Sequence, residues 1–394
     1  MPGTLSSFSR LVRHGQILCI YPAAFEDEEE RIANYSIPDD LLYEEVTLTT
    51  SDGIELKCFL LRTVAKQKTR AKSGGSAEVP SGSQSGVSQT SGPRATVIAF
   101  HGNGYHVWHH AYSGQNFVKM GCDILLVSYR GYGNSKGRPS EKGLRRDAQA
   151  ALEYVLADPE LSKSPIILHG HSLGGAVAVA LIARNPSKIA GLILENTFLS
   201  IPLVVKDLPV LRHLTPFIHQ TWESRKRILK VPRTTPIMII AGKKDLVVPE
   251  THSRGLWRIS RRRGLDIERP KRTSFACGGK QELDEDKPTR TESRDEERKK
   301  ESEGEDGNPE DLQNDMYLCI PNGTHADTWT SPDYWVAVER FISSIERNVV
   351  DLSDLITVSP NIWATLRVSV SQLISPSRSH RQERAYCSQA NYET

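Results

Sequence analysis

The chain has 394 residues, of which 38% are hydrophobic, and its formal net charge at pH 7 is +2. A charge so close to zero gives no electrostatic case for a nucleic-acid partner. The six cysteines are scattered without a C-x-x-C pair, which argues against a zinc ribbon or a disulfide framework and fits a reducing compartment.

The first elements along the chain are an N-terminal segment and a hairpin. Residues 1–43 contain one short apolar patch, at 17–21, and we expect this segment to pack on the domain that follows, over 44–349. No apolar run approaches the roughly 20 residues that a membrane-spanning helix needs. Two β-rich runs lie at 45–49 and 54–61, and the Asp-Gly pair between them is typical of a hairpin turn.

Two stretches of unusual composition predict disordered insertions, at about residues 67–94 and 263–315. In the first, 12 of the 20 residues from 73 to 92 are Ser or Gly. In the second, residues 282–311 hold 14 acidic and 6 basic side chains with almost nothing apolar. Such segments cannot bury enough apolar surface to offset the entropy that they lose on ordering.

From residue 95 onward, apolar strands alternate with helical patterns, which predicts a mostly parallel, doubly wound sheet of about eight strands. A proline-containing stretch at about 197–230 interrupts this alternation and predicts a small helical cap. The tail, 350–394, is polar, but apolar residues at helical spacing predict an amphipathic helix over 361–374, docked on the protein's own surface or on a membrane surface. We expect these later strands at 95–100, 123–128, 165–168, 191–194, 236–240 and 316–320, and helices at 141–156, 173–183 and 332–347.

The run Gly170-His171-Ser172-Leu173-Gly174 directly follows one of these strands and precedes a helix of small residues. In this context a G-x-S-x-G motif predicts a sharp strand-to-helix turn that exposes a nucleophilic serine, as in the α/β-hydrolase fold. The flanking glycines remove the clashes that a strained turn creates. The unpaired amides of the helix N-terminus then point toward the reacting oxygen. Ser172 is the predicted nucleophile.

A serine hydroxyl needs a base, and in this fold the acid and then the histidine follow the nucleophile, each after a later strand. Asp245 follows the strand at 236–240, and His325 follows the strand at 316–320. Both positions lie at the carboxyl edge of the sheet, where open α/β sheets place their sites. Asp327 is an alternative acid, but it lies two residues after His325 and in no separate loop after a strand. Asp245 is therefore the predicted acid.

An oxyanion site needs two backbone N–H donors. The amide of Leu173, directly after the nucleophile, is one candidate, and the amide of Asn103 in the loop after the strand at 95–100 is the other. Four histidines lie close to this loop in the sequence. Because no cysteine or carboxylate accompanies them at ligand spacing, we expect them to line a pocket, and we predict neither a metal ion nor a cofactor. They are His101, His106, His109 and His110.

Six runs of sequence resemble the Bem46 family of α/β-hydrolases. The resemblance spans roughly residues 16–348 apart from the two insertions, and it places the family's triad on Ser172, Asp245 and His325. Ala326 stands where the family tends to have Asn, and Leu246 where an acidic residue is common. The six runs are FHGN at 100–103, YRGYGNSKGRPSE at 129–141, GHSLGG at 170–175, ENTF at 195–198, DLVVP at 245–249 and GTHADTW at 323–329.

The resemblance also carries expectations about location. Members of this family usually begin with a membrane-spanning segment, which implies association with endomembranes or the cell periphery and roles in polarity and morphogenesis. This chain shows no such segment, so a cytoplasmic form is a second expectation. Relatives among the α/β-hydrolases include protein depalmitoylases.

The residues together predict a serine hydrolase. Ser172 attacks an acyl carbon, His325 takes and returns the proton, and Asp245 orients and stabilises the imidazolium. The substrate is then a small molecule or an acylated protein with an ester, thioester or amide bond, and long-chain acyl thioesters on proteins are the first expectation. The alternative is a hydrolase-fold binding or scaffold protein, which the complete triad disfavours.

Overall fold

The computed structural model describes most of the chain between residues 15 and 357. The chain divides into two units, residues 1–346 and 347–394, and every strand among the described residues lies in the first. The predicted amphipathic helix over 361–374, most of segment 1–43 and most of both predicted insertions lie outside the described residues. Those described are 15–26, 41–63, 92–104, 106–208, 212–265, 312 and 314–357.

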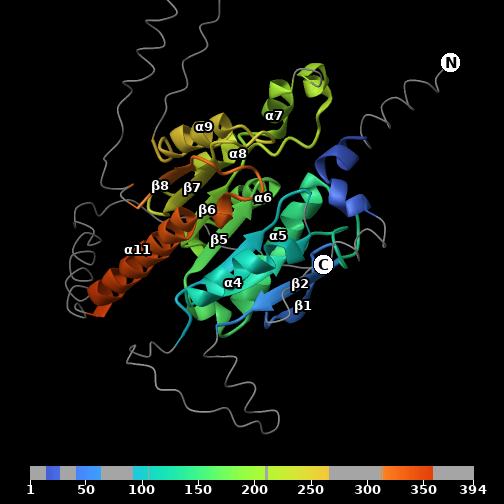
Figure 1. Ribbon diagram of the computed structural model, residues 1–394. Coiled ribbons are helices and arrows are strands. Elements are labelled where there is room, and N and C mark those ends of the chain that lie inside the picture. Colours follow the sequence, from blue (N-terminus) through green and yellow to red (C-terminus); the bar gives the residue numbers. More distant parts are fainter. Residues whose placement is uncertain are drawn as a thin grey trace, which may run out of the picture. The chain divides into compact units, whose positions relative to one another are not determined.

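Eight strands form one sheet in the first unit (Figure 1). They are β1 (Glu44–Thr49), β2 (Glu55–Leu61), β3 (Thr96–Phe100), β4 (Asp123–Val127), β5 (Ile166–His171), β6 (Gly191–Glu195), β7 (Ile237–Gly242) and β8 (Met316–Ile320). Their order is β1-β2-β4-β3-β5-β6-β7-β8. β2 pairs antiparallel with β1 and β4, and the pairs from β4 to β8 are parallel. This architecture confirms the predicted fold class.

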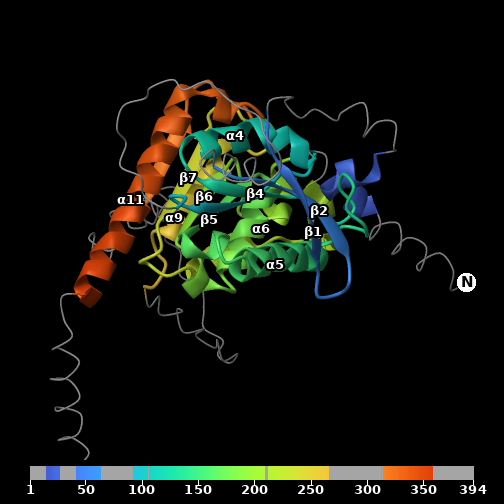
Figure 2. The ribbon, with the colours of Figure 1, turned by 90° about the horizontal axis from the view of Figure 1, so that it is seen from below.

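Helices cover both faces of the sheet, as Figure 2 shows. The side chains of α5 (Glu141–Ala157), α6 (Leu173–Ile182) and α9 (Glu250–Ser260) enter one apolar core. Those of α4 (Ala111–Lys119) and of the first part of α11 (Pro332–Thr357) enter the other. Because the central strands are buried on both faces, β3, β4, β6 and β7 are buried at every position, which explains their continuous apolar sequences.

The strand order reverses at β3. β4 lies on one side of β3, and β5 and all later strands lie on the other. In open α/β sheets ligands bind outside the carboxyl ends of the strands at such a point. The loop after β3 and the turn after β5 both begin at this edge, so the fold itself brings these two segments together.

Short helical segments connect β6 to β7, in the stretch where the cap was predicted. They are α7 (Ile201–Asp207), η5 (Arg212–Phe217), α8 (Ser224–Arg227) and η6 (Ile228–Lys230). The N-terminal residues contact this region. Tyr21 is fully buried, and its hydroxyl accepts a hydrogen bond from Trp222 Nε1 at 3.0 Å, while Gln16 Oε1 accepts one from the His219 amide at 2.9 Å.

The structure corrects the predicted bounds of both insertions. Arg94, at the end of the first, forms ion pairs with Glu339 and Glu346 of α11 at 2.8 and 2.7 Å. Arg263 and Asp315, at the two ends of the second, pair with each other at 2.7 Å, and their side chains are 0% and 1% exposed. The bounds 67–94 and 263–315 were therefore too wide, because an ion pair between residues far apart leaves no mark on local composition.

Within the described residues, no helix combines the length and the apolar character needed to cross a membrane.

Candidate active site

Ser172 lies in the turn between β5 and α6, with φ 53° and ψ −117°. A positive φ is strained for any residue other than glycine, and such strain is concentrated at functional sites. The turn closes because its neighbours lack side chains. A Cβ on Gly170 would lie 2.4 Å from Gly174 O, and a Cβ on Gly174 would lie 2.0 Å from Phe100 O. The two glycines thus allow α6 to approach β5 and β3.

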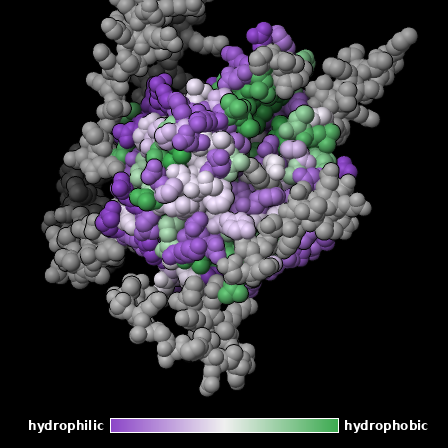
Figure 3. All heavy atoms as spheres, in the orientation of Figure 1, coloured by the Kyte–Doolittle hydropathy of each residue, from purple (hydrophilic) through white to green (hydrophobic). Residues whose placement is uncertain are grey.

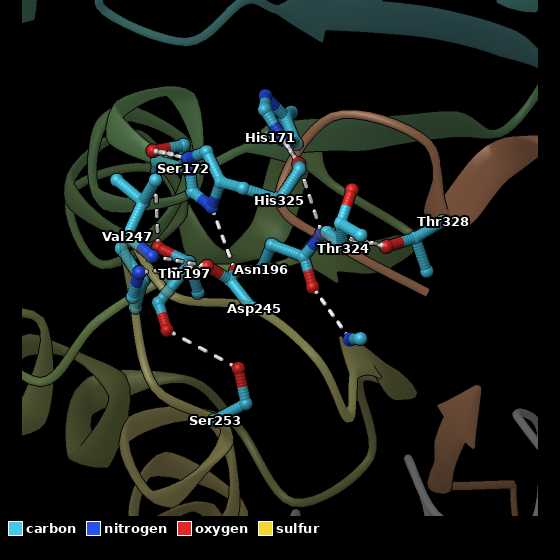
Figure 4. A network of polar contacts seen from close by, with 12 residues as sticks. His171, Ser172, Asn196, Thr197, Asp245, Val247, Ser253, Thr324, His325 and Thr328 are labelled. Atoms are coloured by element: carbon cyan, nitrogen blue, oxygen red, sulfur yellow. Dashed lines mark hydrogen bonds and ion pairs between the residues drawn. The ribbon is translucent and has the colours of Figure 1, made fainter. Parts of the chain in front are cut away.

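Three side chains meet at this turn (Figure 4). His325 Nε2 lies 3.0 Å from Ser172 Oγ, and His325 Nδ1 lies 2.7 Å from Asp245 Oδ2. The other oxygen of Asp245 accepts hydrogen bonds from the amides of Val247 and Val248, at 2.8 Å each. The carboxylate therefore uses one oxygen to hold its own loop and the other to hold the imidazole.

These contacts define which ring nitrogen of His325 carries the proton. An ionised carboxylate can only accept, so His325 Nδ1 must carry the proton that it shares with Asp245. In the neutral ring, Nε2 then presents a lone pair to the hydroxyl of Ser172. The arrangement can accept a proton from the serine and can stabilise the resulting imidazolium.

The alternative acid, Asp327, makes a different contact. Its Oδ1 accepts a hydrogen bond from the amide of Thr324 at 2.7 Å, so it caps the loop that carries His325. The structure brings Asp245, and not Asp327, to the imidazole.

Asn196, directly after β6, fixes the loop of His325 through side-chain hydrogen bonds. It is 1% exposed, and its Nδ2 lies 3.1 Å from His325 O and 2.7 Å from Thr328 Oγ1. Its Oδ1 accepts from the amide of Gly242 at the end of β7, at 2.7 Å. The sequence does not reveal this role, because an asparagine after a strand is more often a turn residue.

The loop after β3 holds the second predicted oxyanion donor. His101 Nδ1 donates to Gly102 O at 2.8 Å, and the hydroxyl of Tyr132 donates to Asn103 O at 3.2 Å. In a trans peptide the N–H points away from the carbonyl, so the first bond turns the Asn103 N–H away from the His101 ring. Burial lowers the pKa of His101 to about 3, which keeps the ring neutral. His101 is thus placed to orient this amide.

A small pocket lies next to the triad. Its walls come from the end of η2 (Val107–His110), from α4, from the ends of β5 and β6 and from the loop after His325. Two of the four histidines expected to line a pocket, His109 and His110, are among its lining residues, whereas His106 bonds Glu26 at 2.9 Å. The lining consists of His109, His110, Ser113, His171, Glu195, Ala326 and Trp329. In the described part of the chain, no three His, Cys, Asp or Glu side chains are placed to hold a metal ion.

Comparison with known proteins defines the family. Residues 91–231 match the Hydrolase_4 family, described as serine aminopeptidase, S33. Protein bem46 of Schizosaccharomyces pombe is 31% identical over 249 residues, which are 62% of this chain and 75% of that protein. The chain belongs to the Bem46 family of α/β-hydrolases.

Other matches agree with this family membership. The α/β-hydrolase domain-containing protein WAV2 of Arabidopsis thaliana is 29% identical over 55% of this chain and 67% of its own length. A Saccharomyces cerevisiae protein named as an uncharacterized membrane protein is 39% identical over 36% of this chain and 50% of its own length. An esterase of Pyrococcus furiosus, 16% identical, shares the fold with a TM-score of 0.50 over 79% of this chain and 94% of that one.

In this Bem46-family chain the run at 129–141 supports the loops around the site through hydrogen bonds and ion pairs. The hydroxyl of Tyr129 donates to His101 O at 3.0 Å. Arg130 is buried and pairs with Asp147 and Asp52, at 2.8 Å in each case. Burial raises the pKa of Asp147 to about 6, although the bonds from Arg130 act in the opposite direction. The run, which forms the loop after β4, is therefore held to the loop after β3 by Tyr129, and to α5 and the turn between β1 and β2 by Arg130.

Proposed function

We propose that the protein is a serine hydrolase that cleaves an acyl ester or thioester, with Ser172 as nucleophile, His325 as base and Asp245 as acid. The observation that carries the proposal is that one imidazole contacts both partners, at 3.0 Å from Ser172 Oγ and 2.7 Å from Asp245 Oδ2. A strained serine, a correctly protonated imidazole and a buried carboxylate are the parts that this chemistry needs.

The reaction follows from the positions of these atoms. Ser172 Oγ bonds to the acyl carbon while its proton passes to His325 Nε2. The carbonyl oxygen becomes negatively charged, and the amides of Leu173 and Asn103 donate to it. The imidazolium returns the proton to the leaving oxygen or sulfur, and an acyl-enzyme remains. Water then attacks the acyl carbon while His325 takes its proton. The bond from the acyl carbon to Ser172 Oγ breaks, His325 returns the proton to Oγ, and the free acid leaves.

The surface near the site favours an apolar acyl group. α7 begins with the run IPLVV, in which every residue is only half-buried. Directly after the catalytic acid, Leu246 and Val247 are 92% and 57% exposed. Figure 3 shows hydrophobic residues gathered over α7. Fully or partly exposed apolar side chains of this kind are typical of a site that receives an apolar partner. Acyl chains linked to proteins or lipids are therefore the proposed substrates.

The description of the matched family supports a serine hydrolase, and the name of one relative supports a substrate at a membrane. The matched family is described as a serine aminopeptidase family, and one yeast relative is named as a membrane protein. We also propose that the protein binds its substrate at a membrane surface. Binding of the full chain to sedimented phospholipid vesicles, compared with binding of the Leu246→Lys variant, tests this part. If wild type and variant remain in the supernatant to the same extent, membrane binding through this surface is contradicted.

Hydrolysis of matched substrates tests the chemistry. Acetyl, octanoyl and palmitoyl groups are presented both as p-nitrophenyl esters and as thioesters. We expect the longer chains to give a kcat/KM at least about tenfold higher than acetyl. We expect Ser172→Ala to lose about 10³-fold or more in turnover. A folded wild-type chain that hydrolyses none of them would support the binding or scaffold alternative instead.

A further inference from the structure

The pocket next to the triad is connected to it through His171. This residue precedes the nucleophile, and its ring lies 5.0 Å from the ring of His325. Its Nε2 donates to His325 O at 2.7 Å. On its other side, the ring lies 5.9 Å from the ring of His110, which lines the pocket. The imidazole ring of His171 would therefore lie between a group bound in the pocket and the catalytic imidazole of His325.

Glu195, the last residue of β6, supplies the carboxylate of this pocket. It is 3% exposed. Its Oε2 accepts a hydrogen bond from the hydroxyl of Tyr334 at 2.9 Å, and that hydroxyl lies 2.9 Å from His169 Nε2. The second oxygen, Oε1, is buried and has no hydrogen-bond partner among the described residues. A buried acceptor without a donor costs free energy, and native structures seldom keep one without a reason.

The charge of the pocket is negative. Burial by itself raises the pKa of Glu195, but hydrogen bonding to His169 and Tyr334, together with the electrostatic attraction of His171 and His169, outweighs it and brings the pKa below its usual value. The pocket's lining residues, all of them described, include neither Lys nor Arg. Burial lowers the pKa of its three histidines, so they are neutral near pH 7. No Lys or Arg of the lining therefore balances the Glu195 charge. His169 lies outside the lining, and its Nε2 is 3.5 Å from Glu195 Oε2, whereas Oε1 has no partner among the described residues.

We propose that this pocket binds a primary ammonium group of the substrate, with Glu195 Oε1 as its hydrogen-bond acceptor and counter-ion. An ammonium group supplies both a donor and a positive charge. A hydroxyl or a water molecule supplies only the donor and leaves the buried charge unbalanced. The indole of Trp329 and the neutral imidazoles around the pocket are also suited to a cation, because aromatic rings attract one through their faces. That the ammonium belongs to the substrate rests on the proposed function.

Direct binding tests the pocket without any turnover. In the full-length Ser172→Ala chain, the affinity for n-propylammonium is compared with that for 1-propanol, which has a similar size and no charge, by calorimetry or NMR titration. We expect the ammonium ion to bind about tenfold more tightly or better, and the further change Glu195→Gln to remove this preference. Equal affinity for the two probes, or a preference that survives Glu195→Gln, overturns the proposal and leaves a pocket that holds water only.

A matched variant separates the pocket from a general loss of buried charge. Glu250 of α9 is also a buried carboxylate, but both its oxygens bond to Arg254, at 2.9 and 2.8 Å. Glu250→Gln should leave the ammonium preference unchanged. If it abolishes the preference as Glu195→Gln does, with both variants folded by circular dichroism, the Glu195 assignment is wrong.

Hydrolysis provides a second arm. We compare 3-aminopropyl octanoate with butyl octanoate, two esters that differ at the end of the alcohol. The wild-type chain should prefer the first by about tenfold in kcat/KM, and Glu195→Gln should lose this preference mainly through KM. Ammonium binding without hydrolysis of either ester supports the pocket and contradicts the proposed function. Hydrolysis of both esters at equal rates, without ammonium binding, supports the proposed function and contradicts the ammonium site.

Discussion

Replacing Asp245 with Asn preserves the shape of the site and reverses the protonation of its imidazole. The amides of Val247 and Val248 both donate to Asp245 Oδ1 at 2.8 Å. In the variant only the carboxamide oxygen can take that position, so the NH₂ group must occupy the place of Oδ2. That place lies 2.7 Å from His325 Nδ1.

The size of the effect follows from this geometry. An NH₂ group can only donate, so His325 Nδ1 must accept and the ring proton moves to Nε2, which faces Ser172 Oγ. A protonated Nε2 cannot take the proton of the serine. In chymotrypsin-like proteases the equivalent change lowers turnover about 10⁴-fold through the wrong tautomer. We expect a loss of about 10³- to 10⁴-fold here, or roughly 4 to 5.5 kcal/mol in the activation barrier.

The assay is turnover of a short-chain acyl ester, with circular dichroism to verify that each variant is folded. Asp327→Asn is the matched control, because Asp327 bonds the Thr324 amide at 2.7 Å and an Asn oxygen can keep that bond. We expect it to cost about tenfold or less. A folded Asp245→Asn variant that keeps turnover within tenfold of wild type, or an Asp327→Asn variant that loses more, would refute the reasoning.

Three further predictions concern stability and the oxyanion loop. Replacing residues 266–311 with a short Gly-Ser linker should shift Tm by no more than a few degrees. Asp315→Asn, in contrast, should lower the free energy of unfolding by about 3–5 kcal/mol, because the buried guanidinium of Arg263 loses its carboxylate partner. Urea titration that gives equal losses for both changes would contradict this. His101→Ala should lower turnover about 10²-fold with little change in KM, because the second oxyanion amide loses its orientation, and an unchanged kcat would remove His101 from the site. Stability should fall as the pH drops from about 6.5 toward 4.5, because the folded pKa values of the buried histidines lie below their unfolded value, each contributing up to about 1.4 kcal/mol per pH unit. Asp147, whose pKa is raised to about 6 in the folded protein, has the opposite effect, because it binds its one proton more readily in the folded than in the unfolded state. A flat profile of unfolding free energy over this range would show that the buried histidines are not held neutral.

The sequence was sufficient for the sheet and for the contacts between the predicted triad residues. Each core strand is an apolar run of its own, so its position can be seen locally. Ser172, Asp245 and His325 each follow such a run, and parallel strands carry their carboxyl ends to one edge. Proximity in space therefore followed from order in the chain, and the structure brings these three side chains together.

Polar contacts between distant residues could not be predicted in this way. Arg263 and Asp315 are 52 positions apart, and nothing in the charged sequence between them marks the pair. Asn196 holds the His325 loop through its side-chain amide, and His101 acts through the carbonyl of its neighbour. Such bonds have no sequence period, because they depend on which loops the sheet brings together.

Three elements were also missed or cut short, and one of them, α9 (Glu250–Ser260), lies where no helix was predicted. The helix α4 reads AYSGQNFVK, where Gly and Ser weaken the helical signal, and no helix was predicted there. The last helix was predicted to end at residue 347, but α11 continues to Thr357. In these three cases packing or helix propagation outweighed the local propensities on which the prediction rested.

The most direct test asks whether Ser172 is an activated nucleophile. The full-length chain is treated with a fluorophosphonate probe, and the labelled residue is located by mass spectrometry. We expect labelling at Ser172, no labelling of a folded Ser172→Ala variant, and normal labelling of Ser253→Ala, which removes a nearby buried serine that donates to Thr197 O at 3.2 Å. A folded wild-type chain that resists the probe, or a folded Ser172→Ala variant that is labelled as fast as wild type, would contradict the assignment of this site.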